Sequence, residues 1–200
     1  MDLLISLIFV CPLLFLAGIV DGIAGGGGII ALPTYILTGM PLNVAYGCNK
    51  MQSCIGTTAS LARYAKSKMF DLKPALVSAL FAIAGSFIST RIMIALSDNI
   101  KNIIIVVFMV FIITLTFVSF KVKSGTLMKR DFTAKNILTC IVIGFVLGLY
   151  DGFFGPGGGT VGAMLFGTIL NYDLRVGNGN SKFIIVVSNF IALISYIVHG

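Results

Sequence analysis

Six stretches of this chain contain no charged residue, and they limit the folds open to it more than any other feature. They cover residues 3–20, 22–49, 74–90, 102–120, 152–172 and 183–198. Most approach or exceed the roughly 20 residues that an α-helix needs to cross a bilayer. Hydrophobic residues make up 58% of the chain and charged residues 10%, which is outside the range of soluble domains. The sequence predicts an all-α, polytopic transmembrane helical bundle, because the alternation of a β-barrel strand is absent.

The positive charge is concentrated at one side of this bundle. Two hydrophobic segments, 74–96 and 101–120, separate two basic clusters, so both clusters lie on the same side of the membrane. The positive-inside rule makes this side cytoplasmic. The net charge of +7 therefore indicates topology and contact with the lipid bilayer rather than nucleic-acid binding. The two clusters comprise Arg63, Lys66, Lys68 and Lys73, then Lys121, Lys123, Lys129, Arg130 and Lys135.

A glycine-rich motif occurs twice. "GIVDGIAGGGGII" at 18–30 returns as "GLYDGFFGPGGGTV" at 148–161, and "NVAYGCNKMQ" at 43–52 returns as "RVGNGNSKFI" at 175–184. Internal repeats of this kind reveal architecture. Whether the repeats are inverted or parallel depends on whether each glycine segment crosses the membrane or returns.

We predict a single integral membrane domain over 1–200. Repeat one covers 1–120, a basic cytoplasmic loop covers 121–134, and repeat two covers 135–200 and lacks its last two helices. The first helix is expected to be retained rather than cleaved, since no positive segment precedes it. Predicted helices of repeat one reach about residue 20 and then cover 43–64, 74–96 and 101–120.

Each glycine run should break a membrane helix. Glycine weakens a helix by about 1 kcal/mol relative to alanine, and broken helices at membrane depth are tolerated only where they are buried in protein or line a cavity. The segments "IIALPTYIL" and "VGAMLFGTIL" are too short to cross and read as half-helices. Their N-termini offer unpaired N–H groups to an anion. Neither run has the Lys-Ser/Thr of a nucleotide loop.

Lys50 and Lys182 each lie well inside an apolar helix. A lysine at the bilayer centre costs at least about 2.5 kcal/mol, so such residues are usually functional. The alternative is an interfacial lysine whose stem reaches the headgroups. Asp21 and Asp151, each just before a break, are candidates for proton coupling. Equally, each could cap or brace its break or pair with the lysine of its own repeat.

The candidate site therefore combines backbone donors, cationic side chains and neutral amides, a set that suits a small oxyanion. The substrate-binding candidates are Gly25, Gly26, Gly27, Gly28, Asn49, Lys50, Gln52, Gly157, Gly158, Gly159, Asn178, Asn180, Lys182 and Asn189. No cofactor and no metal are expected, because the four cysteines show no ligand spacing and His199 has no partner.

Small residues recur every four positions on two helices. They are Ser78, Ala82, Ser86 and Thr90, then Cys140, Gly144, Gly148 and Gly152. Spacing of four keeps them on one face, so they predict close helix packing. A homodimer through such faces is one arrangement they allow.

Several local motifs resemble those of the TauE/SafE family of membrane permeases. They are the glycine break followed by Pro33, the turn from Gly39 to Pro41, "NKMQ" at 49–52, "GNSK" at 179–182 and "SN" at 188–189. The resemblance implies export of sulfite, an organosulfonate or a related anion across the cytoplasmic (inner) membrane of a prokaryote. Two departures are the missing last helices and Pro156 inside the second glycine run.

We therefore expect a secondary transporter of a small anion and no enzyme. One alternative is an anion channel using the same cavity. The other is a membrane-embedded enzyme, assembly factor or interaction protein, for which one His, seven Asp and no Glu offer few reactive groups.

Overall fold

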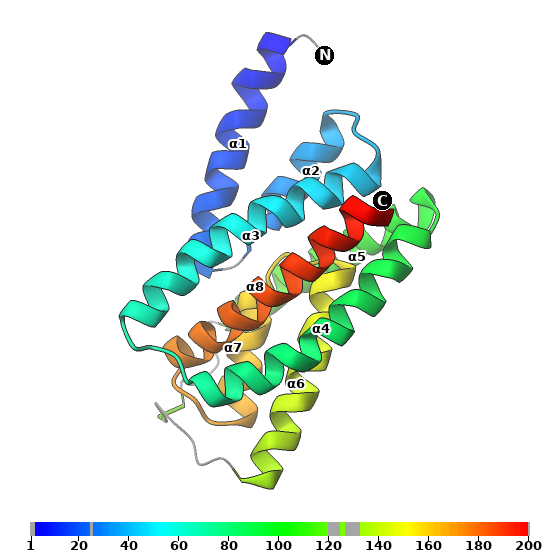
Figure 1. Ribbon diagram of the computed structural model, residues 1–200. Helices are drawn as coiled ribbons and strands as arrows, with labels where there is room; N and C mark the ends of the chain where they lie inside the picture. The colour runs from blue at the N-terminus through cyan, green and yellow to red at the C-terminus, as the bar shows by residue number, and fades with distance from the viewer. Residues whose placement is uncertain (1–2, 25, 120–124, 127–132, 200) are drawn as a thin grey trace.

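The chain forms a bundle of eight α-helices in the part that the computed structural model describes, residues 3–24, 26–119, 125–126 and 133–199 (Figure 1). This confirms the predicted all-α class. The helices are α1 Leu3–Ala24, α2 Gly28–Leu37, α3 Leu42–Lys66, α4 Leu72–Ala95, α5 Asp98–Ser119, α6 Ala134–Phe153, α7 Gly158–Ile169 and α8 Leu174–His199.

Four of the described helices are long and apolar enough to cross a bilayer: α4, α5, α6 and α8. Many large apolar side chains are exposed on the outside of the bundle, including Phe15, Leu80 and Ile197. Such a surface is unfavourable in water and favourable against lipid. The chain is therefore an integral membrane protein.

The two short helices begin at the glycine runs, as predicted. α2 starts at Gly28 and α7 starts at Gly158. The second break needs glycine for its backbone, because Gly155 and Gly157 have φ of +91° and +80°. Gly27, the residue before α2, has an ordinary φ of −58°. In Figure 1, α2 returns toward the end of the bundle where α1 begins, and α7 returns toward the end where α6 begins.

The two halves of the chain run in opposite directions. α1 enters the bundle from the top of Figure 1 and α6 enters from the bottom. α3 and α8 lie in contact and are antiparallel, with the C-terminus of α3 and the N-terminus of α8 at the lower left. α4 packs on α6 and α8.

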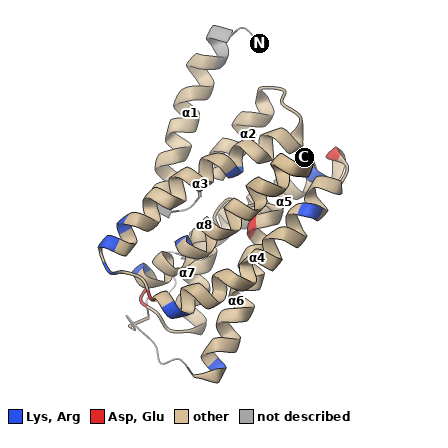
Figure 2. Ribbon diagram, viewed as in Figure 1, with Lys and Arg blue, Asp and Glu red and all other residues tan. Residues whose placement is uncertain are grey.

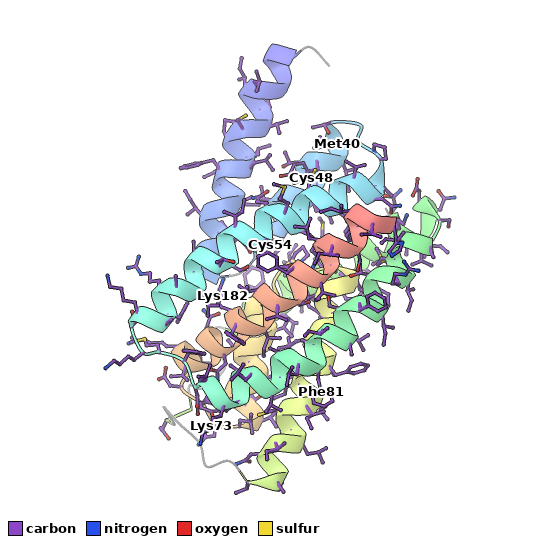
Figure 3. The ribbon with its side chains drawn as sticks, viewed as in Figure 1. Met40, Cys48, Cys54, Lys73, Phe81 and Lys182 are labelled. Carbon is purple, nitrogen blue, oxygen red and sulfur yellow. The ribbon has the colours of Figure 1, made fainter. Side chains whose placement is uncertain are left out.

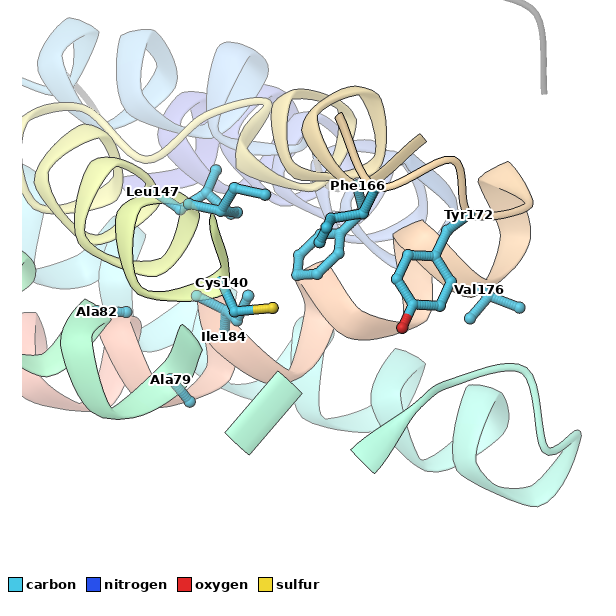
Figure 4. Packing of buried hydrophobic residues seen from close by; sticks show 10 residues of the cluster. Ala79, Ala82, Cys140, Leu147, Phe166, Tyr172, Val176 and Ile184 are labelled. Atoms are coloured by element: carbon cyan, nitrogen blue, oxygen red, sulfur yellow. The ribbon is translucent and has the colours of Figure 1, made fainter. Parts of the chain in front are cut away.

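The small-residue faces of α4 and α6 pack against each other, which confirms their predicted packing role. A Cβ added at Gly144 would overlap the carbonyl oxygen of Ser78, and one at Gly148 would overlap that of Ala82. Ser78 Oγ also donates to the carbonyl of Cys140, at 2.8 Å. Figure 4 shows how this contact continues into an apolar core shared with α7 and α8, around Leu147, Phe166, Tyr172 and Ile184.

Charged side chains gather at the two ends of the bundle, and a few lie inside it (Figure 2). Arg63 and Lys66 belong to the last turn of α3, Lys73 to the start of α4, and Lys135 to the start of α6. These segments share the lower end of the bundle in Figure 2. Of the predicted basic residues, Lys121, Lys123, Lys129 and Arg130 lie outside the described residues.

Candidate anion site

The second glycine break is held by a lysine from the first half of the chain. Lys50 Nζ lies 3.0 Å from Asp151 Oδ2 and also donates to the main-chain carbonyl of Asp151. Its third partner is Asn189 Oδ1 on α8, at 3.1 Å. Ser188 Oγ donates to the same Asp151 Oδ2 at 2.6 Å. Asp151 therefore forms an ion pair with Lys50 inside a buried hydrogen-bond network.

The first glycine break is held by the matching lysine from the second half. Lys182 Nζ donates to the main-chain carbonyl of Asp21 at 2.7 Å. The Asp21 carboxylate turns toward the start of α2, where its Oδ1 accepts from Gly27 N–H at 3.3 Å. Asp21 thus braces its break, one of the roles expected from the sequence. Asp151 pairs with Lys50, the lysine of the other half of the chain, whereas the sequence suggested pairing with the lysine of the same repeat.

Both lysines are far from the bundle ends. Lys50 is 1% exposed and Lys182 is 0% exposed. Figure 3 shows Lys182 deep between the helices, well away from Lys73 at the start of α4. The alternative of an interfacial lysine reaching the headgroups is therefore wrong for both. Each ammonium group instead donates a hydrogen bond to a main-chain carbonyl beside the glycine break in the opposite half of the chain.

The two breaks also touch each other. A Cβ added at Gly28 would lie 2.6 Å from Pro156 Cγ and 3.1 Å from Asn49 Oδ1. A Cβ added at Gly155 would lie 2.8 Å from Lys50 Nζ. Glycine at these positions lets the two half-helix N-termini and a lysine meet without a side chain between them.

Three predicted amides hold the bundle together outside this centre. Gln52 Oε1 accepts from Tyr35 OH and its Nε2 donates to Leu14 O, joining α2, α3 and α1. Asn178 Nδ2 donates to Tyr64 OH at 2.8 Å. Asn180 Oδ1 accepts the main-chain N–H of Asp71 at 2.8 Å, which fixes the turn between α3 and α4. The structure brings Asn189 to Lys50 and Asn49 to the start of α2, and it leaves these three elsewhere.

The remaining predicted positions are backbone positions. Gly26, Gly27 and Gly28 are buried at the start of α2, and Gly157, Gly158 and Gly159 are buried at the start of α7. Gly25 lies outside the described residues. Sequence reasoning did not single out Ser188, which donates to Asp151 Oδ2, or Gly56, which lies against Asp21. The signal for Ser188 was available, because it precedes Asn189 in the motif "SN".

A cavity of about 720 Å³ lies beside the first break, between α1 and α3. Gly22 and Gly56 belong to its wall near Asp21, and Arg63 and Arg175 belong to its wall at the basic end of the bundle. The cavity thus joins the cationic end of the molecule to the neighbourhood of a buried carboxylate.

These groups suit binding better than bond-making chemistry. Among the described residues, Lys182 donates to one acceptor and the side-chain nitrogen of Asn189 to none, so both can offer hydrogen bonds to a charged solute. The described residues contain no group of three or more His, Cys, Asp or Glu that could hold a metal ion.

Comparison with known proteins identifies the family. The family model described as "Sulfite exporter TauE/SafE" matches residues 10–200. The chain belongs to the TauE/SafE family. Three bacterial relatives are named as probable membrane transporter proteins, and the matches cover nearly all of this chain. Their names and the family description indicate a membrane transporter rather than an enzyme.

The relatives are distant and somewhat longer. The Haemophilus influenzae protein is 29% identical over 190 residues, covering 93% of this chain and 72% of the relative. The Sinorhizobium protein ORF9 is 29% identical over 186 residues, 93% of this chain and 69% of the relative. Escherichia coli K12 YfcA is 26% identical over 203 residues, covering 98% of this chain and 74% of the relative. No solved structure matches the chain.

Proposed function

We propose that this TauE/SafE-family chain is a secondary transporter that moves a small anion across the cytoplasmic membrane. The substrate class is sulfite, a sulfonate or a related sulfur or organic oxyanion, and the direction is export. The family description, which names a sulfite exporter, supports both the class and the direction. The basic end of the bundle then faces the cytoplasm.

One observation carries the proposal: each buried lysine closes the glycine break of the opposite half of the chain. Lys50 bonds to the Asp151 carbonyl and Lys182 bonds to the Asp21 carbonyl. A buried ammonium group costs several kcal/mol unless it is paired, so two of them meeting at two broken helices favour a functional site. Lys182 has no carboxylate within ion-pair distance among the described contacts, so its charge is the one available to an anion.

We infer further that the two halves are inverted repeats. α1 and α6 run in opposite directions, as do α3 and α8, and each half returns at its glycine break (Figure 1). Discontinuous helices at the interface of inverted repeats are the usual site of substrate binding in secondary transporters. Alternating access would follow from one half moving against the other, with the lysine contacts exchanged between states. Asp21 and Asp151 are the candidates for coupling protons to that movement.

The test is transport in proteoliposomes that contain the purified chain. Labelled sulfite, sulfate, thiosulfate, taurine and acetate are offered one at a time, with protein-free liposomes as the control. We expect saturable flux of at least one sulfur oxyanion and acceleration by the same anion on the opposite side. Linear flux without that acceleration would show an anion channel instead. Absence of flux for all five solutes would contradict transport of this substrate class.

A further inference from the structure

Asp21 and Asp151 occupy matching places beside the two breaks, but their carboxylates have different partners. Asp151 Oδ2 accepts from Ser188 Oγ and pairs with Lys50 Nζ. Asp21 Oδ2 is buried and has no hydrogen-bond partner among the described residues. Asp21 is only 4% exposed, so bulk water does not replace the missing donor. A buried carboxylate oxygen without a partner is costly while it is charged.

The difference has an identifiable cause in the sequence. Ser188 follows Lys182 by the same number of residues as Gly56 follows Lys50. Gly56 lies directly against Asp21, since a Cβ added there would be 3.2 Å from Asp21 Oδ2. The hydroxyl that Asp151 receives from α8 is therefore absent at the corresponding position of α3. Gly56 also lines the cavity beside α1, which places the bare oxygen next to that space.

The charges around Asp21 determine whether its unpartnered Oδ2 atom can bind a proton. Lys182 from α8, Lys50 from α3 and Asp151 from α6 act on its carboxylate, and α2 contributes the Gly27 N–H. Two lysines and two aspartates sum to zero. A monovalent anion that enters leaves one unit of negative charge in a buried site, which is strongly unfavourable. Adding one proton to a carboxylate restores neutrality.

We propose that Asp21 takes up the proton that travels with the anion, while Asp151 keeps its ion pair with Lys50. The proton bonds to Asp21 Oδ2 from water on the side where the anion enters, and it returns to water on the other side. Transport is then electroneutral symport of an anion and a proton. This inference rests on the proposed function and assigns distinct roles to the two aspartates.

Methanesulfonate is the probe, because it is a fully ionised monovalent anion and cannot carry a proton itself. Proteoliposomes are prepared with an alkaline interior, an entrapped pH dye and a membrane potential clamped at zero. We expect the pH gradient to drive labelled methanesulfonate inward, with about one proton entering per anion. Methanesulfonate flux without proton entry would overturn this inference alone. Absence of methanesulfonate flux, together with absence of flux for the five solutes tested above, would overturn the proposed function and this inference with it.

Two variants separate Asp21 from Asp151. Asp21→Asn should lower pH-driven uptake by about tenfold or more, while exchange of anion for anion falls less than about threefold. Gly56→Ser supplies the missing hydroxyl, which favours the ionised carboxylate. It should therefore move the pH of half-maximal uptake downward by about one unit.

Ser188→Ala is the matched control, because it removes the hydroxyl from Asp151 and leaves Asp21 untouched. It should leave the pH of half-maximal uptake in place. If Ser188→Ala moved that pH and Gly56→Ser did not, the proton would belong to Asp151. Gly56→Ser keeps both carboxylates, so it tests the proposal even if Asp21→Asn does not fold.

Discussion

Lys50 and Lys182 differ in what holds them, and the difference matters for how each residue can be tested. Lys50 forms an ion pair with Asp151 at 3.0 Å and bonds to Asn189. Lys182 bonds to a main-chain carbonyl. Removing Lys50 therefore breaks a direct ion pair, whereas removing Lys182 takes away a hydrogen bond to a carbonyl and a cation that acts on the Asp21 carboxylate without a direct ion pair. Loss of transport in a Lys50 variant would combine a folding defect with a functional one.

The ion pair predicts strong coupling between its members. Lys50→Met or Asp151→Asn alone should lower the free energy of unfolding by about 3–5 kcal/mol, because each leaves an unpaired buried charge. The double variant should lose less than the sum of the single losses, by about 1–3 kcal/mol. Unfolding in mixed micelles with increasing denaturing detergent measures all four proteins. Strictly additive losses would contradict the pair.

The sequence was sufficient to find both lysines, because a charge inside an apolar helix is conspicuous. It did not reveal which residues the two lysines contact. Lys50 meets Asp151 and Lys182 meets Asp21 only because the two halves pack against each other, which no local pattern encodes. The partners of Asn178 and Asn180 were hidden for a related reason. Polar residues near one end of α8 are as useful for fixing Tyr64 and the turn at Asp71 as for binding a solute.

The glycines on two helices have opposite surroundings. On α6, a Cβ at Gly144 would overlap the Ser78 carbonyl of α4. On α1, a Cβ at Gly18 would meet no atom within 4 Å. The predicted stripes on α4 and α6 therefore face each other, whereas Gly18 lines the cavity between α1 and α3.

Leucine substitutions should reveal this difference. Gly144→Leu is expected to lower the free energy of unfolding by about 2–3 kcal/mol, since the new side chain forces α4 and α6 apart. Gly18→Leu, at a glycine inside a comparable helix, should be within about 1 kcal/mol of the parent. Detergent-induced unfolding of the two variants provides the comparison. Equal destabilisation would mean that α4 and α6 do not approach as closely as described.

Element boundaries followed the local chemistry well in most places. The half-helices begin at the predicted glycines, because the glycine run interrupts the preceding helix and the apolar residues after it can form a new one. α1 is the exception, since it continues to Ala24 rather than ending near residue 20. The physical reason is Asp21, which does not end the helix but remains helical and bonds across the break to Gly27.

At the scale of the whole molecule, the opposite directions of the two halves predict which turns face which side of the membrane. Met40 precedes α3 at one end of the bundle, and Ile169 ends α7 at the other (Figures 1 and 3). In a background without native cysteines, Met40→Cys should react with an impermeant maleimide added outside cells. Ile169→Cys should react only after the cells are opened. Labelling of both from the same side would contradict inverted repeats.

The most direct test of the central claim is exchange of sulfite across proteoliposomes by the Lys182→Gln variant. Glutamine keeps a donor for the Asp21 carbonyl and removes the charge that an anion would meet. Lys135→Gln, at an exposed position at the start of α6, is the matched control. The account predicts that sulfite exchange falls by about a hundredfold or more in Lys182→Gln and stays at the parental rate in Lys135→Gln, with both proteins folded. Exchange at the parental rate in folded Lys182→Gln would contradict a substrate site between the two glycine breaks.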